Sequence, residues 1–249
     1  MILVGITGSI GSGKSTFAEF LSEQTDRHIH FESGQLIAEI ANEFRKNSSQ
    51  SPVSSDIDGI NYWLRQLPPI VEQVTHKPLD YKQLVITPTK LKEAPANYAK
   101  LLEYLDYMAT NPKYLDSQIT DENKDLFRSL LQWIGGYLVK IIGSGVWYDE
   151  LIRRAQHTPN IELATIGGVR FPGEARRVVS AGGSVISINR PSIDTKDPNE
   201  ITERERGLIV PDTTIINDAG LPELLSVAAL VYKDLQTSNL VTGYTASAF

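Results

Sequence analysis

A stretch rich in glycine and serine near the start of the sequence has the composition and spacing of a phosphate-binding loop. Residues 8–16 read GSIGSGKST, which fits the pattern G-x-x-x-x-G-K-[ST]. An apolar run at residues 2–7 precedes the loop, and a stretch of helical composition at residues 17–21 follows it. Glycine backbones can curl so that successive N–H groups point at phosphate oxygens, and the start of the next helix adds a positive dipole end. The sequence therefore predicts a site for the phosphates of a nucleotide at a strand–helix junction.

The side chains of this loop suit the binding of phosphate and metal. Lys14 can reach the outer phosphates of a nucleotide, and the Ser15 hydroxyl can ligate Mg²⁺. We therefore assign Lys14 a catalytic role and Ser15 the role of metal ligand. The residues expected to hold the nucleotide are Gly8, Ser9, Gly11, Ser12, Gly13, Lys14, Ser15 and Thr16. The competing interpretation, an ordinary turn between a strand and a helix, is disfavoured by the complete spacing with Lys-Ser at its end.

The overall composition argues against several classes of protein. The chain has 249 residues and a formal net charge of −6, so a general nucleic-acid-binding surface, which is normally basic, is not expected. Any anionic substrate must be held by local arginines and lysines. The sequence has no cysteine, which excludes disulfides and thiolate metal sites. It shows neither a signal peptide nor an apolar run of about 18 residues, so we expect a cytoplasmic protein with no membrane partner.

The four histidines do not indicate a metal site. Only His28 and His30 are close in sequence, and two residues at i and i+2 of a strand face the same side. No third ligand lies near them in the sequence, so the pair is interpreted as part of a strand face.

Short apolar segments alternate with helical patterns in the first and last parts of the chain. Strands are predicted at residues 2–7, 27–32, 161–166, 184–189 and 213–217. Such alternation is typical of a parallel sheet with helices on both faces. We therefore predict an α/β protein with the three-layer P-loop NTPase fold and a five-stranded parallel sheet.

The middle of the chain is mainly helical in composition. Residues 81–88 could instead be a strand, and Gly135-Gly136 interrupt the longest helical pattern, residues 121–142. A glycine inside a helix costs roughly 1 kcal/mol relative to alanine, which indicates a kink or a close approach to another element. The predicted division is a core at 1–46 and 158–237, a mainly helical insertion at 47–157, a lid-like segment at 191–211 within the core, and a loose tail at 238–249.

Two polar clusters follow predicted strands. Glu32-Ser33 come after the second strand, and Arg170 and Glu174 come after the third. Ligands of an open parallel sheet bind at the carboxyl ends of its strands, so these side chains should face the ligand of the phosphate loop. A guanidinium held there can stabilise charge on a transferring phosphoryl group. Two alternatives stay open: a strand end with Ser33 as helix N-cap, and a surface Arg170 paired with Glu174.

Basic residues in two other segments could contribute to the same site. Arg190, Arg204 and Arg206 flank a charged stretch before the last strand, where a mobile flap would exclude water and add positive charge over bound phosphates. Acidic residues balance the bases of this stretch, so a solvated loop is the alternative. On the longest helix, Arg128 and Gln132 are one turn apart and could grip a phosphate and a base, or form a partly solvated face.

Several motifs together resemble the nucleoside monophosphate kinase superfamily, and within it the phage-type deoxynucleoside monophosphate kinases, with dephospho-CoA kinases as neighbours. Residues 130–135, LLQWIG, are similar to the L-L-Q-x-x-G helix of that family, and residues 169–175, VRFPGEA, to its segment D-V-R-F-P-N-E-A. The segments 181–191, 216–218 and 221–225 also match. The resemblance covers about the first 45 residues and roughly 125–235.

The resemblance implies transfer of the ATP γ-phosphoryl group to a (deoxy)nucleoside monophosphate, giving ADP and a nucleoside diphosphate. ATP and Mg²⁺ are then the cofactors and nucleotides the substrates, while the oligomeric state is open, a homodimer included. The residues that would bind ATP or stabilise the transferred charge are Lys14, Arg170, Arg204 and Arg206. The residues that would bind the acceptor are Glu32, Ser33, Arg128, Gln132, Arg170 and Glu174, and the helical insertion would complete this half of the site.

The chain departs from the family segment at two positions. Gly168 stands where that segment has aspartate, and Gly173 where it has asparagine. In the family this aspartate helps to hold the water shell of Mg²⁺, and Glu32 is the residue of this chain that can substitute for it. Two other functions stay open: phosphoryl transfer to a hydroxyl, as in dephospho-CoA kinases, and nucleotide binding without kinase turnover.

Overall fold

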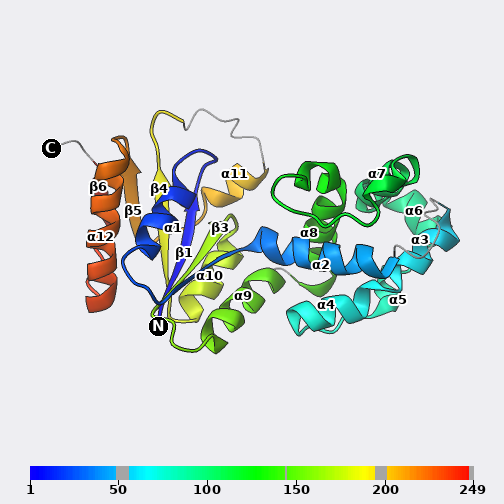
Figure 1. The fold of residues 1–249 in the computed structure, drawn as a ribbon, viewed down its shortest axis with the longest axis horizontal. Coiled ribbons are helices and arrows are strands. Elements are labelled where there is room, and N and C mark those ends of the chain that lie inside the picture. The colour runs from blue at the N-terminus through cyan, green and yellow to red at the C-terminus, as the bar shows by residue number, and fades with distance from the viewer. Residues whose placement is uncertain (49–55, 144, 194–200, 247–249) are drawn as a thin grey trace. The chain divides into compact units, whose positions relative to one another are not determined.

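The computed structural model describes residues 1–48, 56–143, 145–193 and 201–246 (Figure 1). The chain forms two compact units. Met1–Ser33 and Tyr148–Phe249 make up the first, and Gly34–Trp147 the second. Among the described residues, every helix is too short or too polar to span a bilayer.

The first unit contains a six-stranded sheet with the order β2-β3-β1-β4-β5-β6, in which every neighbouring pair is parallel. Its strands are β1 (Ile2–Gly8), β2 (His28–Glu32), β3 (Leu163–Val169), β4 (Ser184–Asn189), β5 (Thr213–Asn217) and β6 (Gly243–Ala246). The α/β class and the parallel sheet predicted from the sequence are confirmed. Because β1 lies between β3 and β4, the glycine-rich loop leaves the middle of the sheet.

The sheet has six strands, whereas the sequence predicted five. The sixth, β6, lies in the C-terminal stretch that the sequence predicted to be loose. It pairs with β5, with Thr214 opposite Gly243 and Asn217 opposite Ala246. Ala246 is almost fully buried, but two of the four residues of β6 are exposed. A strand this short carries too little apolar alternation to be recognised, so pairing with β5 decides its structure.

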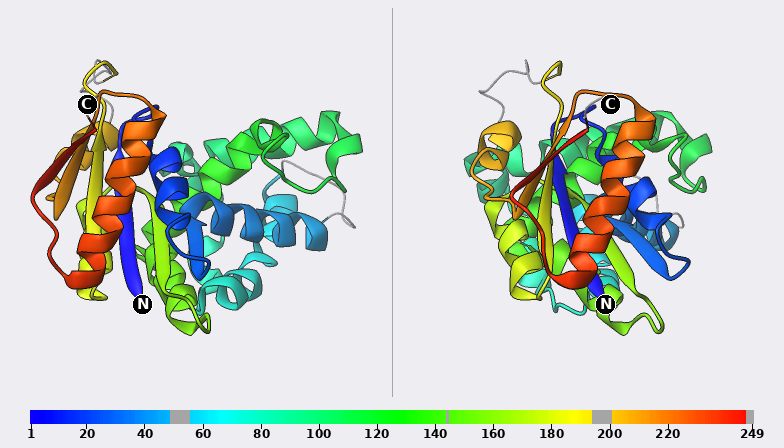
Figure 2. Two further views of the ribbon diagram at one scale, coloured as in Figure 1. Left: turned by 60° about the vertical axis from the view of Figure 1, so that its left-hand side comes forward. Right: turned by 90° about the vertical axis from the view of Figure 1, so that its left-hand side faces the viewer.

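Helices cover both faces of this sheet (Figure 2). They are α1 (Lys14–Ser22), α9 (Val146–His157), α10 (Pro172–Ser180), α11 (Ile201–Arg206) and α12 (Leu221–Thr237). Val4 and Ile6 of β1 share one apolar core with α1 and α12. Successive strand residues point to opposite faces, and Gly5 accordingly faces α10, where a Cβ atom would lie 3.1 Å from Val178. An ion pair of 2.8 Å between Arg177 and Asp149 joins α10 to α9.

The second unit is helical, and no strand occurs among its described residues. Its helices are α2 (Ser33–Ser48, which starts one residue before the unit), α3 (Ile57–Leu64), α4 (Leu67–Thr75), α5 (Tyr81–Leu84), α6 (Pro88–Glu93), α7 (Ala99–Thr110) and α8 (Arg128–Ile142), with 3₁₀ turns at Pro95–Asn97, Pro112–Tyr114 and Lys124–Phe127. Trp63 is the centre of an aromatic core, with ring centroids 5.5 Å from Phe44 and 6.4 Å from Tyr104. The ambiguous segment 81–88 thus begins with a short helix and contains no strand.

Gly135 of α8 permits a close approach between two helices. A Cβ atom on Gly135 would lie 2.9 Å from the Cδ1 atom of Ile37 on α2. Glycine at this position therefore lets α2 pack closely against α8, which is one of the two explanations that the sequence offered.

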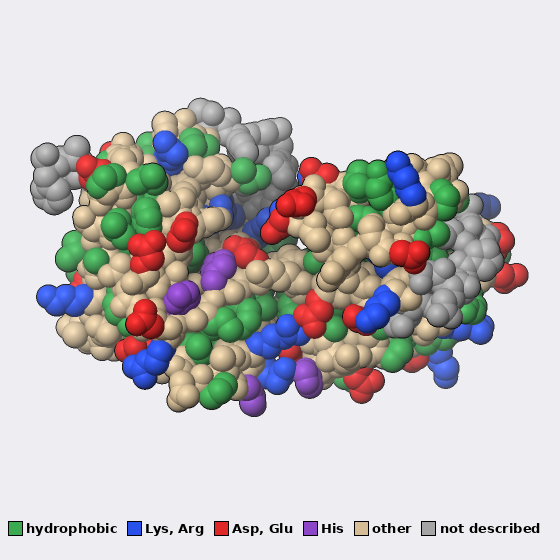
Figure 3. Space-filling model, viewed as in Figure 1, with side chains coloured by type: hydrophobic (Ala, Val, Ile, Leu, Met, Phe, Trp, Pro, Cys, Tyr) green, Lys and Arg blue, Asp and Glu red, His purple; other side chains and the backbone are tan. Residues whose placement is uncertain are grey.

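The charges on the described surface are mixed. On the face drawn in Figure 3, basic and acidic side chains stand in small groups, without a broad area of one sign. With a net charge of −6, the chain must hold an anionic ligand through individual residues rather than through a general positive field.

Candidate active site

The glycine-rich loop connects the end of β1 to the start of α1, as the sequence predicted. Three of its glycines have positive φ angles: Gly8 at 147°, Gly11 at 82° and Gly13 at 98°. A Cβ atom on Gly8 would lie only 2.3 Å from the carbonyl oxygen of Ile188. The backbone path of the loop therefore requires glycine, both for its dihedral angles and for its distance from β4.

Lys14 and Ser15 lie at the start of α1. The Nζ atom of Lys14 donates a hydrogen bond of 2.6 Å to the carbonyl oxygen of Ser9, so the amine lies back over the loop. No side chain caps α1 at Gly13, and the first N–H groups of a helix have no partner within the helix. A phosphate at this helix end would meet these N–H groups together with the positive charge of Lys14.

The hydroxyl of Ser15 suits a metal that is carried by a nucleotide. Within the described ranges, no three side chains of His, Cys, Asp or Glu come together as a metal cluster. Mg²⁺ that binds with a nucleotide commonly takes one or two protein ligands and completes its shell with phosphate oxygens and water. Ser15 is exposed in the first turn of α1, next to Lys14, and so fits that requirement.

Asn217 at the end of β5 holds the loop in place. Its Nδ2 atom donates a hydrogen bond of 2.8 Å to the carbonyl oxygen of Ser12, and only 6% of Asn217 is exposed. A Cβ atom on Gly13 would lie 2.5 Å from the same Nδ2 atom. In the sequence, residues 216–218 stand out only as part of a resemblance, and no role is predicted for Asn217. The signal that could have found it is a polar residue that ends an apolar strand of a parallel sheet.

Arg170 and Glu174 lie at the carboxyl end of β3, where α10 begins. A carboxylate oxygen of Glu174 accepts hydrogen bonds from the backbone N–H groups of Arg170, at 2.8 Å, and of Phe171, at 3.1 Å. Burial raises the pKa of Glu174, although these N–H groups and the nearby Arg170 and Arg177 oppose the shift. Glu174 therefore fixes the turn that presents the exposed Arg170 side chain, through the backbone rather than through the side-chain pair that the sequence offered as an alternative.

Tyr148 lies beneath the same strand end. Its hydroxyl donates a hydrogen bond of 3.2 Å to the carbonyl oxygen of Gly167. Burial raises the pKa of Tyr148 well above its usual value, and the negative charges of Glu174 and Glu32 raise it further. The tyrosine thus stays neutral and supports the backbone of β3 between two carboxylates. No signal in the sequence distinguishes it from other apolar-face tyrosines.

Glu32 ends β2 and lies opposite Gly167 in the β2–β3 ladder. A Cβ atom on Gly167 would lie 1.9 Å from the Oε1 atom of Glu32 and 2.6 Å from its Cδ atom. Gly168, at φ 71°, would place a Cβ atom 3.1 Å from the Oε2 atom of Glu32. The two glycines therefore leave the space that the Glu32 carboxylate fills. Ser33 follows as the first residue of α2 and is half-buried.

The segment predicted as a lid is described only in part, because residues 194–200 lie outside the described ranges. Ile193 packs against the phosphate loop, since its Cδ1 atom would lie 3.3 Å from a Cβ atom on Gly11. Arg190 is exposed after β4, and α11 carries Arg204, which is exposed, and Arg206, which is half-buried.

Arg128 and Gln132 belong to the second unit. Both are exposed on α8 one turn apart, and Arg128 pairs with Asp125. The neighbouring Trp133 is buried, and its Nε1 atom donates a hydrogen bond of 3.1 Å to the carbonyl oxygen of Asn97. Trp133 therefore belongs to the core of this unit, while Arg128 and Gln132 present polar groups on its surface.

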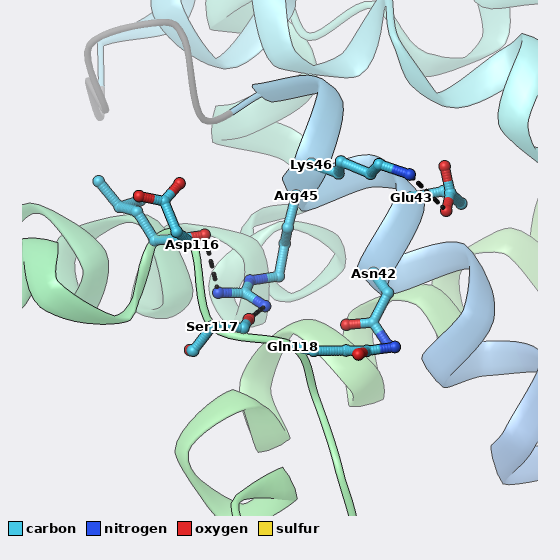
Figure 4. Close-up of a pocket in the computed structure, with 8 residues that line it drawn as sticks. Asn42, Glu43, Arg45, Lys46, Asp116, Ser117 and Gln118 are labelled. Carbon is cyan, nitrogen blue, oxygen red and sulfur yellow. Dashed lines mark hydrogen bonds and ion pairs between the residues drawn. The ribbon is translucent and has the colours of Figure 1, made fainter.

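The second unit also contains a pocket of about 350 Å³, drawn in Figure 4. It is lined by Asn42, Glu43, Arg45 and Lys46 of α2 and by residues 115–118. Arg45 is only 3% exposed and donates hydrogen bonds to the Tyr104 hydroxyl and to carbonyl oxygens of residues 114, 115 and 117. Its guanidinium also stacks 4.1 Å from the ring centroid of Phe127. Arg45 therefore holds the segment of residues 114–117 to α2.

Comparison with known proteins adds an independent observation. No protein-family model matches the chain. Over 228 residues the chain is 24% identical to a protein of Acanthamoeba polyphaga mimivirus named "Putative deoxynucleotide monophosphate kinase". The alignment covers 91% of this chain and 93% of that protein. The chain is its distant, full-length homologue.

This homology confirms the resemblance that the motifs indicated. Because the match spans 91% of the chain, it includes much of the central helical part, where no motif was recognised. Together with the parallel sheet and its phosphate loop, the homology supports nucleotide kinases as the broad class, and with them the use of ATP.

Proposed function

We propose that this chain is an ATP-dependent kinase that transfers the γ-phosphoryl group to a (deoxy)nucleoside monophosphate, producing ADP and a nucleoside diphosphate. The observation that carries the proposal is the loop at residues 8–15, which leaves the central strand with three positive-φ glycines and starts α1 at Lys14. The name of the distant homologue supports the class of the acceptor.

The donor half of the site is formed by the loop and α1. Backbone N–H groups would hold the β- and γ-phosphates, and Lys14 would exchange the Ser9 carbonyl for phosphate oxygens. Mg²⁺, held through the Ser15 hydroxyl, would neutralise negative charge on these phosphates. In this proposal Arg204 and Arg206 belong to a lid and approach the phosphates after ATP binds.

The transfer step requires charge neutralisation more than proton removal. The bond between the γ-phosphorus and the oxygen that bridges to the β-phosphate breaks, and a bond to an oxygen of the acceptor phosphate forms. A phosphate monoester has a second pKa of about 6, so its oxygens need no general base at neutral pH. Lys14 and Arg170 would stabilise the charge of the transferring group, and Glu174 would orient Arg170 by holding its backbone.

Each unit carries residues that we propose for binding the acceptor. Glu32 can accept hydrogen bonds only, so it would hold a sugar hydroxyl or a water molecule of the Mg²⁺ shell, with Ser33 beside it. On α8, Arg128 would bind the acceptor phosphate, and Gln132 would bind the base. A nucleotide base has both hydrogen-bond donors and acceptors, as the amide of Gln132 does.

An ADP-release assay with candidate acceptors tests the proposal. The chain would be given ATP and Mg²⁺ with each of the four deoxynucleoside monophosphates, AMP or dephospho-CoA. Turnover with a monophosphate supports the proposal, and turnover with dephospho-CoA alone would assign a hydroxyl acceptor. ATP binding without acceptor-dependent turnover would refute the kinase function.

Substitution of the loop lysine tests the assignment of the site. Lys14→Ala should abolish turnover while the circular dichroism spectrum and the unfolding transition stay those of the folded protein, because Lys14 stabilises charge at the phosphates rather than the core. Lys233→Ala, on the exposed side of α12, is the matched control and should keep full activity. Activity that survives in the Lys14 variant contradicts the site assignment.

A further inference from the structure

The imidazole of His30 lies between a buried hydroxyl and an acidic side chain. Its Nδ1 atom is 2.7 Å from the Oγ1 atom of Thr165, and its Nε2 atom is 3.4 Å from the Oε1 atom of Glu32. His30 and Glu32 are two residues apart on β2 and therefore point to the same face. Thr165 is directly opposite His30 in the β2–β3 ladder and is only 1% exposed, so the ring is held at one end by a rigid group.

The position of the Glu32 carboxylate, at the other end of the ring, is also restricted. Gly167 is paired with Glu32, and any side chain at position 167 would occupy the place of the carboxylate, since a Cβ atom would lie 1.9 Å from Oε1. The Glu32 carboxylate therefore lies across the carboxyl end of β3, at the edge where the loop and Arg170 also lie.

The chemistry of the three groups fixes the tautomer of the histidine. A neutral imidazole has one donor and one acceptor nitrogen, and a carboxylate can only accept. The nitrogen that faces Glu32, Nε2, must therefore carry the hydrogen. Nδ1 is then the acceptor and receives the hydroxyl hydrogen of Thr165, which gives a directed chain from Thr165 through His30 to Glu32.

We propose that His30 is a positioning residue that, with Thr165 and Gly167, holds the Glu32 carboxylate toward the acceptor. The effect on turnover rests on the proposed function, because it requires that Glu32 touches the acceptor or the water around Mg²⁺. The orientation of the carboxylate does not depend on that function, since the contacts lie within the first unit and involve no ligand.

Two substitutions of His30 separate its two contacts. The amide nitrogen of glutamine reaches about as far as Nε2, and that of asparagine about as far as Nδ1. His30→Asn should lower kcat/KM for the acceptor about tenfold, as Glu32→Gln should, while the KM for ATP stays within about twofold, because a donor to the carboxylate is lost. His30→Gln restores that donor and should recover most of the activity. The double variant His30→Asn/Glu32→Gln should be no worse than Glu32→Gln alone, since both act through one carboxylate.

Gly167→Ala provides a second route to the same displacement. Its methyl group should expel the carboxylate and lower kcat/KM for the acceptor as Glu32→Gln does, with ATP binding unchanged. Gly136→Ala on α8, where a Cβ atom would meet nothing within 4 Å, is the matched control. Three results would each overturn the proposal. They are an equal loss of kcat/KM in His30→Asn and His30→Gln, fully additive effects in the double variant, and a Gly167→Ala variant that keeps its activity.

Nitrogen-15 NMR of the histidine ring provides a readout without turnover. At a pH of about 8, where free imidazole is neutral, His30 should be the Nε2–H tautomer in the wild type and a mixture of tautomers in Glu32→Gln. The signal is assigned by its absence from His30→Gln. An Nδ1–H tautomer overturns the positioning role even if the chain is an active kinase. The Nε2–H tautomer in a chain without turnover supports the positioning role and refutes the proposed function.

Discussion

Asn217 is the residue whose replacement should damage the proposed phosphate site most selectively. Its amide is the donor of the 2.8 Å hydrogen bond to the Ser12 carbonyl, and it stands against Gly13 at the start of α1. Asn217→Asp has almost the same shape but replaces the NH₂ donor with an oxygen that faces the carbonyl oxygen. The loop should lose the conformation that we propose to bind phosphate, while β5 itself remains.

The size of the effect follows from the burial of this contact. Leaving a buried carbonyl without its donor costs about 1–3 kcal/mol. If the whole cost falls on nucleotide binding, the Kd for ATP rises about 5- to 150-fold. Asn217→Ala removes the donor without adding charge. Asn217→Asp should bind ATP more weakly still, because its carboxylate would repel the phosphates as well as the carbonyl of Ser12.

Isothermal titration calorimetry with ATP and Mg²⁺ measures this effect directly. The matched control is Asn239→Asp, which makes the same chemical change at an exposed position of the same unit. The control should bind ATP as the wild type does. If Asn217→Asp remains folded and its Kd for ATP lies within about twofold of the control, Asn217 does not hold the loop for ATP, because a loss of about 1 kcal/mol already exceeds that ratio.

Three further substitutions can be compared in urea-induced unfolding followed by tryptophan fluorescence. Gly8→Ala should lower the free energy of unfolding by about 1–3 kcal/mol, because Gly8 has a φ of 147° and its Cβ atom would lie 2.3 Å from the Ile188 carbonyl oxygen. Gly34→Ala, which has open space at its Cβ atom, should not lower it, and equal effects of the two substitutions would contradict the requirement for glycine at position 8. The wild-type free energy of unfolding should fall as the pH rises above the ordinary carboxyl range. Burial raises the pKa of Glu174 in the folded state, so ionisation of its carboxyl group destabilises the folded protein. Glu174→Gln should flatten this fall, and an unchanged slope would show that Glu174 does not cause it. Arg45→Met should lower the free energy of unfolding by about 2–4 kcal/mol, since it leaves the buried Tyr104 hydroxyl and three partly buried carbonyls without their donor. The exposed control Arg176→Met should change it little, and similar values for the two would rule out the role of Arg45 in holding residues 114–117 to α2.

The elements that could be predicted from the sequence are those whose information is local. The loop at residues 8–15 combines a continuous pattern with the strand and helix that it requires, and the long apolar strands of the core carry their own burial pattern. Glycine at positions 8, 11 and 13 allows the positive φ angles that the structure has. These features depend on neighbours in the chain, so a single sequence contains them.

Other elements depended on pairing between distant segments. β6 forms because β5 offers an unpaired edge, not because residues 243–246 have a strong preference for a strand. Similarly, Gly135 was recognised as a helix interruption, but only the packing of α2 identifies Ile37 as the side chain that needs the space.

The candidate site also contains residues that the local sequence reveals and residues that only distant contacts reveal. Lys14, Arg170 and Glu32 could be proposed from a motif and from strand ends. Asn217 and Tyr148 could not, because they contact backbone atoms of residues far away in the sequence. From the sequence, Gly168 could be interpreted only as the loss of the aspartate side chain that the similar family has there. In the tertiary structure, the β2–β3 register places Glu32 over the two glycines, and the absence of a Cβ atom there is what admits the carboxylate. The glycine-rich loop could be predicted from the sequence alone, because its pattern lies in consecutive residues. Only the register of the sheet shows which distant side chains hold that loop and fill the space beside it.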